Sequence, residues 1–293
     1  MSVTLAGCAS ARHRTVPAGL PASARAVVLA PVRVAHTRLG AVGYRIVGTG
    51  LPLILITGYT ATINGWDPRF VGALAEHYRV VIFDNAGVGR TRALPAPLTI
   101  DAMANQTSAL ISALGLGKPD VLGWSMGGTI AQAVAVLHPA KVRRLVLCAT
   151  FPGTGKITPP SPAAAHALTS GNVQEVMADL FPASQAAAQQ AFLAATAAYP
   201  PHPPTPAAAI AAQAQAVNVW LGGTDPAGQK TATITAPTLI ADGTIDRLDP
   251  VANDHALAQL IGGARLKLYP DAGHAFLFQD EEAFVPLIVA FLH

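Results

Sequence analysis

The chain has 293 residues, of which 51% are hydrophobic and 12% are charged, and its formal net charge is +3. A chain of this length and composition can bury a large core as a single compact domain. The positive excess is confined to the amino end, because residues 1–66 hold six Arg and no Asp or Glu, while the remainder holds 13 basic and 16 acidic residues. The body of the protein therefore lacks the basic face that a nucleic-acid-binding protein needs.

The amino end contains a short motif, Leu5-Ala-Gly-Cys8, that resembles a bacterial lipobox, in which the cysteine becomes lipidated. A secretory signal needs a basic start and an apolar run of about 7–15 residues, and the residues before Cys8 provide neither. Two interpretations stay open: an upstream start with a lipid anchor at the cell envelope, or a chance match in a cytoplasmic protein. We expect residues 1–30 to form a flexible tether or the remnant of a lipoprotein signal.

From residue 31 onward, short apolar segments alternate with helical patterns. This alternation predicts a mostly parallel sheet covered by helices on both faces. An initial hairpin is expected at 31–48, and further strands are expected at 53–57, 79–84, 120–124, 142–149, 237–242 and 265–269. Cys148 falls in one of these strands and is expected to be a buried free thiol.

Residues 120–137 place one serine between a strand and a helix. In the pattern G-x-S-x-G, here Gly123, Ser125 and Gly127, the serine takes a strained backbone conformation that lifts its hydroxyl clear of the sheet. Trp124 stands beside it as a candidate substrate contact. The strand-turn-helix context favours a nucleophile over an ordinary glycine-rich turn.

The segment from about 151 to 230 breaks the strand-helix alternation and is rich in Ala, Pro and Gln. Short helices separated by prolines fit it better than a sheet layer. It also carries few charges.

A serine hydroxyl needs a base, and His274 is the best-placed of the nine histidines. It follows the last predicted strand in a glycine-containing loop, from which it can reach the carboxyl edge of the sheet. The other histidines lie in the tail, in a proline-rich stretch, at the last position, or in segments where a surface or core histidine is the usual outcome.

The base in turn needs a carboxylate that fixes its tautomer. Asp246, on the loop after the preceding strand, is the best candidate. Asp242 lies at the end of the strand, Asp249 is expected to cap the next helix, and Asp271 is too close to His274 in sequence. No acidic residue occurs from 121 to 174, which excludes an acid on an earlier loop.

The order Ser125, Asp246, His274 resembles that of the α/β-hydrolase superfamily, and the resemblance covers residues from about 31 to 293. It implies an α/β fold with a mostly parallel eight-stranded sheet, helices on both faces and a helical cap inserted at about 151–230. It also implies an oxyanion hole made by the backbone amides of Tyr59 and Met126. A cap of this kind roofs the substrate pocket, and its few charges suit an uncharged, apolar acyl or alkyl group. Met177, Phe181 and Trp220 are its candidate pocket residues, although a lid without specific contacts is nearly as good an interpretation. The usual His-Gly before the oxyanion turn is Thr57-Gly58, which leaves the substrate class open.

The glycine loops do not fit cofactor binding. No lysine follows Gly128 to bind phosphates, and Arg92 occupies the place of the third glycine of a dinucleotide fingerprint. The sequence contains no H-E-x-x-H or His-x-His cluster, and its two cysteines are far apart. We therefore expect neither a cofactor nor a metal.

The sequence favours a serine hydrolase that cleaves a small, largely apolar carboxylic ester or related acyl substrate. Perhydrolysis or cofactor-free halogenation with peroxide, hydrolysis of a carbon-carbon bond, and removal of an amino-terminal residue remain alternatives on the same triad. A ligand-binding protein without turnover is a further alternative, although such a protein has no need of all three groups. The oligomeric state cannot be inferred from the sequence.

Overall fold

A computed structural model describes residues 19–170 and 172–293. Its centre is an eight-stranded sheet in the order β1-β2-β4-β3-β5-β6-β7-β8. The first two strands pair antiparallel with each other, β2 pairs antiparallel with β4, and the remaining neighbours are parallel. The strands are β1 (Arg33–Thr37), β2 (Gly40–Val47), β3 (Pro52–Ile56), β4 (Arg79–Phe83), β5 (Asp120–Trp124), β6 (Leu145–Cys148), β7 (Thr238–Gly243) and β8 (Arg265–Tyr269).

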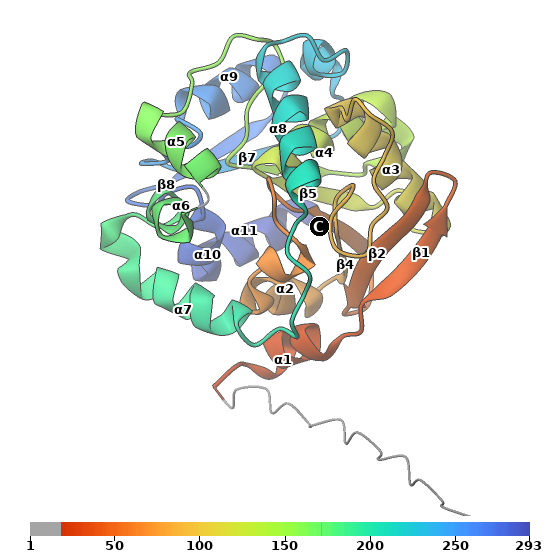
Figure 1. The fold of residues 1–293 in the computed structure, drawn as a ribbon, viewed down its shortest axis with the longest axis vertical. Helices are drawn as coiled ribbons and strands as arrows, with labels where there is room; N and C mark the ends of the chain where they lie inside the picture. Colours follow the sequence, from red (N-terminus) through yellow and green to blue (C-terminus); the bar gives the residue numbers. More distant parts are fainter. Residues whose placement is uncertain (1–18, 171) are drawn as a thin grey trace, which may run out of the picture.

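Helices cover both faces of this sheet, as the strand-helix alternation predicts. Within the described residues they are α1 (Ala22–Leu29), α2 (Pro68–Ala75), α3 (Ile100–Ala113), α4 (Met126–Leu137), α5 (Pro162–Ser170), α6 (Val173–Leu180), α7 (Ala186–Thr196), α8 (Ala207–Leu221), α9 (Ala252–Leu260), α10 (Phe276–Gln279) and α11 (Glu281–Leu292). Figure 1 shows the sheet running from β1 on the right to β8 on the left, with α8 drawn across its centre.

The alternation of side chains along each strand divides the core into two layers. Leu53 and Leu55 of β3 pack on one face with residues of α1, α2 and α11, whereas Ile54 and Ile56 pack on the other face with residues of α3 and α4. Both faces of the central strands are therefore buried, and this explains why their sequences are continuous apolar runs.

The structure differs from the sequence prediction at the amino end. Residues 22–29, expected to belong to a flexible tether, form helix α1, whose Ala24, Val27 and Val28 are buried. Gly72 of α2 permits this contact, since a Cβ there would lie 2.7 Å from the backbone of Ala24. Leu5 and Cys8 lie outside the described residues.

Among its described residues, the segment expected to form a cap contains the four α-helices α5 to α8, coloured green to teal in Figure 1. Proline residues separate several of them, as the sequence predicts; Pro182 follows α6 and Pro206 precedes α8. No helix in the described ranges is long and apolar enough to cross a membrane.

Candidate active site

Ser125 occupies the sharp turn between β5 and α4. Its φ of 57° and ψ of −125° lie in a region that residues with a side chain rarely adopt. The turn is held by the Ser125 N–H, which donates to Cys148 O at 2.9 Å, and by the Thr150 hydroxyl, which donates to Ser125 O at 2.8 Å. This strained conformation is the one that the sequence predicts for a nucleophile on an elbow.

Two glycines allow the elbow to pack against its neighbours. A Cβ on Gly127 would lie 2.0 Å from Ile56 O, and a Cβ on Gly123 would lie 2.2 Å from Gly127 O. No side chain fits at such distances. The G-x-S-x-G spacing is therefore a packing requirement of the turn.

His274 and Asp246 come together although 28 residues separate them. The Nδ1 of His274 lies 2.6 Å from Oδ2 of Asp246, and both residues are buried. The other oxygen of Asp246, Oδ1, accepts hydrogen bonds from the N–H groups of Leu248 at 2.7 Å and Asp249 at 2.9 Å. Because a carboxylate can only accept, Nδ1 donates to it and Nε2 is left as the basic nitrogen.

Trp124 connects the elbow to the histidine loop. Its indole Nε1–H donates to the backbone oxygen of His274 at 2.9 Å, and the two rings lie 5.9 Å apart between centroids. The residue before the serine thus fixes the backbone that carries the histidine.

Ser125 and His274 line the same cavity, which has a volume of about 590 Å³. Within the described part of the protein no hydrogen bond joins the Ser125 hydroxyl to the imidazole. Such bonds are often long in an unliganded enzyme and tighten when substrate binds. Because both side chains line one cavity, a ligand bound there can contact Ser125 and His274 together.

The two expected oxyanion amides lie beside the serine. Gly58 approaches it so closely that a Cβ would be 3.2 Å from Ser125 Cβ and 3.7 Å from its Oγ, and Tyr59 follows directly. Met126 is the first residue of α4, where backbone N–H groups have no acceptor within the helix. Tyr59 and Met126 both line the cavity.

The rest of the cavity wall is mostly apolar and comes largely from the segment 151–230, which was expected to form a cap. Among the described lining residues, Tyr59 and His274 are the only ones with ionisable side chains. The polar lining groups are neutral hydroxyls and amides, chiefly those of Thr60, Asn64 and Asn218. This wall suits an uncharged ligand, because a charge would lose its hydration without gaining a partner.

Two of the four predicted substrate contacts, Trp124 and Met177, line the cavity. The other two do not. Phe181 is 2% exposed and packs against Phe192 with ring centroids 5.3 Å apart, while Trp220 is fully buried and its Nε1–H donates to Phe151 O at 3.2 Å. Both are large aromatic residues of the segment 151–230 whose side chains are buried in the core layers.

The sequence analysis missed several wall residues that a helical pattern could have identified. Ala214, Val217 and Leu221 of α8 line the cavity and are spaced three and four residues apart. That spacing places them on one face of the helix. The signal was weak because α8 is apolar on nearly every face.

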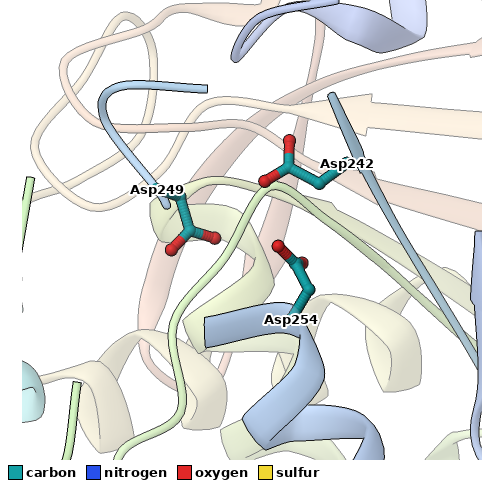
Figure 2. A group of neighbouring side chains, drawn as sticks. All are labelled: Asp242, Asp249 and Asp254. Atoms are coloured by element: carbon teal, nitrogen blue, oxygen red, sulfur yellow. The ribbon is translucent and has the colours of Figure 1, made fainter. Parts of the chain in front are cut away.

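Three buried carboxyl groups gather beside the loop that carries Asp246. They belong to Asp242, Asp249 and Asp254, whose nearest oxygens all lie within 4.8 Å of one another, and Figure 2 shows them converging. Burial raises the pKa of Asp254 to about 8 and raises the pKa values of Asp242 and Asp249 well above their usual range. Protons on the carboxyl groups therefore relieve their mutual repulsion at neutral pH.

These three carboxyl groups are oxygen ligands of the kind that a divalent cation takes, and the sequence analysis did not anticipate the cluster. None of them lines the catalytic cavity. Asp249 does not cap α9 as expected; its Oδ1 accepts instead from the Asn253 side chain at 2.8 Å.

Comparison with known proteins agrees with this geometry. Residues 52–281 match the family model described as alpha/beta hydrolase fold. The 2-hydroxy-6-oxo-2,4-heptadienoate hydrolase of Pseudomonas putida is 27% identical over 255 residues, which are 84% of this chain and 90% of that protein.

Two further similarities extend the comparison. The polyketide synthase ThaQ of Burkholderia thailandensis is 33% identical over 230 residues, but these are 75% of this chain and only 11% of that protein. The structure of a thermophilic esterase from Thermogutta terrifontis is 25% identical, with a TM-score of 0.69 and coverage of 90% of this chain and 98% of that chain.

Proposed function

Because the chain belongs to the alpha/beta hydrolase family, we propose that it is a serine hydrolase that cleaves a small, largely apolar carboxylic ester or a related acyl compound. The observation that carries this proposal is that Ser125, His274, Tyr59 and Met126 line one cavity whose remaining wall is mostly apolar. The similarity to an esterase at 25% identity supports the ester as the substrate class.

In the proposed reaction the Ser125 hydroxyl oxygen attacks the acyl carbon while Nε2 of His274 takes the hydroxyl proton. Asp246, bonded to Nδ1 at 2.6 Å, stabilises the imidazolium that results. The amides of Tyr59 and Met126 bind the negative oxygen of the tetrahedral intermediate. In enzymes of this kind one such donor contributes roughly 3 kcal/mol to transition-state binding.

The intermediate collapses when the imidazolium returns its proton to the alcohol leaving group, and the acyl group stays on Ser125. A water molecule then attacks the acyl-enzyme, with His274 again taking a proton, and the carboxylic acid and free serine are released. The mostly apolar wall lowers the local dielectric and so strengthens each of these electrostatic contacts.

The cavity dimensions support a small acyl or alkyl group. A volume of about 590 Å³ lies within the usual range for small-molecule sites, and cap residues such as Leu168, Val176 and Leu221 provide its apolar lining. Neither a fixed cation nor a carboxylate lies among the described lining residues, so an anionic or cationic substrate finds no partner there.

The test is hydrolysis of p-nitrophenyl esters from acetate to dodecanoate, with the Ser125→Ala variant beside the wild type. We expect turnover of short and medium acyl chains by the wild type and none by the variant. Peroxide-dependent halogenation, a carbon-carbon cleavage substrate and aminoacyl amides are assayed in parallel. Turnover of one of these with no ester hydrolysis would replace the ester proposal, and tight ligand binding without any turnover would indicate a binding protein.

A further inference from the structure

The loop that carries the Tyr59 amide is held mainly by the cap. Four hydrogen bonds join residues 59–64 to residues 200–213. Two of them involve the Thr60 backbone: its N–H donates to Gln213 Oε1 at 2.9 Å, and its carbonyl oxygen accepts from the Thr205 hydroxyl at 2.7 Å. In the other two, the Tyr59 hydroxyl donates to Ile210 O at 3.3 Å and the Asn64 side-chain amide donates to Pro200 O at 3.0 Å. The loop and the cap therefore form one hydrogen-bonded unit.

Thr60 is the strained residue of this unit. Its φ is +59°, in the left-handed region that a β-branched residue seldom adopts. Both of its backbone polar groups bind the cap, the N–H to Gln213 and the carbonyl to Thr205. A strained conformation persists only where its surroundings impose it, and here the surroundings are cap side chains.

The position of Thr60 fixes its neighbour. The Thr60 N–H belongs to the peptide unit that joins Tyr59 to Thr60, and the Tyr59 N–H belongs to the unit before it, so the Cα of Tyr59 links the two planes and a rotation at Thr60 displaces the Tyr59 backbone. On the other side, Gly58 packs directly against Ser125. The Tyr59 amide is thus held between the nucleophile and the residue that the cap constrains, and an oxyanion donor works only when it is preorganised in this way.

Side-chain packing does not explain why a glutamine occupies position 213 in this hydrogen-bonded unit. It is fully buried on α8, and its Nε2 finds no partner in the described part of the protein. A buried amide with an unpaired donor is unfavourable for folding, whereas an apolar side chain of similar size would avoid that burden. The atom that the fold uses is Oε1 of Gln213, which accepts the hydrogen bond from the Thr60 N–H.

We propose that Gln213 is a positioning residue that holds the Tyr59 amide in the oxyanion hole through its bond to the Thr60 N–H, so that docking of the cap assembles the catalytic site. This inference rests on the serine hydrolase function proposed above. It makes α8 both a wall of the substrate cavity and a support for the transition state.

The test compares Gln213→Leu with Gln215→Leu, a matched control on the exposed face of the same helix. We would measure kcat and KM for a p-nitrophenyl ester, the inhibition constant of phenylboronic acid, and the melting temperature. The boronic acid is informative because its tetrahedral adduct places an oxygen in the oxyanion hole. Since losing an oxyanion donor outright costs about 10²–10³ in kcat, loss of its support should lower kcat roughly tenfold.

The boronic acid constant should rise by the same factor as kcat falls, with KM and the Gln215→Leu variant nearly unchanged. Gln213→Glu, which keeps an oxygen acceptor, should restore most of kcat, and Thr205→Val gives a second way to loosen Thr60 if Gln213→Leu does not fold. The inference is overturned if Gln213→Leu keeps wild-type kcat and wild-type affinity for the boronic acid. The same result in folded Thr205→Val overturns it if Gln213→Leu does not fold. Either result leaves the proposed function intact. A wild-type protein that neither turns over esters nor reacts with a fluorophosphonate overturns both.

Discussion

Replacement of Asp246 by asparagine tests the proposed roles of the His274 nitrogens most sharply, because the structure dictates how the new amide must turn. In the native site Oδ1 accepts two backbone N–H groups and Oδ2 faces His274 Nδ1. An amide retains one oxygen. If its NH₂ faced the two backbone donors, both would be buried without an acceptor, at about 1–3 kcal/mol each.

The amide oxygen therefore takes the Oδ1 position, and the NH₂ group faces Nδ1. Nδ1 must then accept a hydrogen bond, which moves the imidazole proton to Nε2, the nitrogen that is proposed to take the proton from Ser125. In an unrelated serine protease the same change lowers kcat about 10⁴-fold. A loss of that size corresponds to about 5.5 kcal/mol of transition-state stabilisation.

The assay is kcat for p-nitrophenyl butyrate, with the melting temperature recorded to show that the two backbone bonds survive. Asp271→Asn is the matched control, since Asp271 is exposed and lies three residues before His274 in sequence. The control should keep wild-type kcat. A loss smaller than about tenfold in folded Asp246→Asn would refute the assigned tautomer and with it the role of Asp246.

Three further experiments test the cavity wall, the carboxyl cluster and the amino terminus. Met177→Ala, on the cavity wall, should shift the preferred ester toward longer acyl chains. Phe181→Ala, in the core, should lower the free energy of unfolding by about 3–5 kcal/mol, as measured with denaturant. The reverse pattern would contradict the assignment of the wall. Because the folded-state pKa of Asp254 is raised to about 8, the protein should lose stability as the pH rises from about 4 through 8. In melting curves recorded across this pH range, Asp254→Asn should reduce the pH dependence of stability. An unchanged pH dependence would count against protonated carboxyl groups in the cluster. Mass spectrometry of protein from its native host distinguishes the two interpretations of the Leu5-Ala-Gly-Cys8 motif: a lipidated Cys8 as the first residue would support the anchor, and an unmodified start at Met1 or Ser2 would exclude it.

The sequence was sufficient to predict the scaffold. Each expected strand is present with ends shifted by at most a few residues, because buried parallel strands are short apolar runs bounded by turn residues. The α/β-hydrolase fold, with its eight-stranded sheet, is confirmed by the strand order and by the family match. Cys148 is a buried free thiol, as expected.

Predictions failed where the outcome depends on tertiary contacts that leave little trace in sequence. Residues 22–29 pack as a helix because Gly72 leaves room for them, which a local pattern cannot show. Phe181 and Trp220 lie in the segment expected to form a cap, but both side chains are buried in the core and neither lines the cavity. The cluster that includes Asp254 was missed because its members come from a strand, a loop and a helix.

Identification of the nucleophile tests the central claim most directly. The protein is treated with a fluorophosphonate, digested, and examined by mass spectrometry for the modified peptide. The account predicts one phosphonylated residue, Ser125, with labelling abolished in Ser125→Ala and strongly slowed in His274→Ala. Labelling that persists in Ser125→Ala, or that maps to another residue, would contradict it.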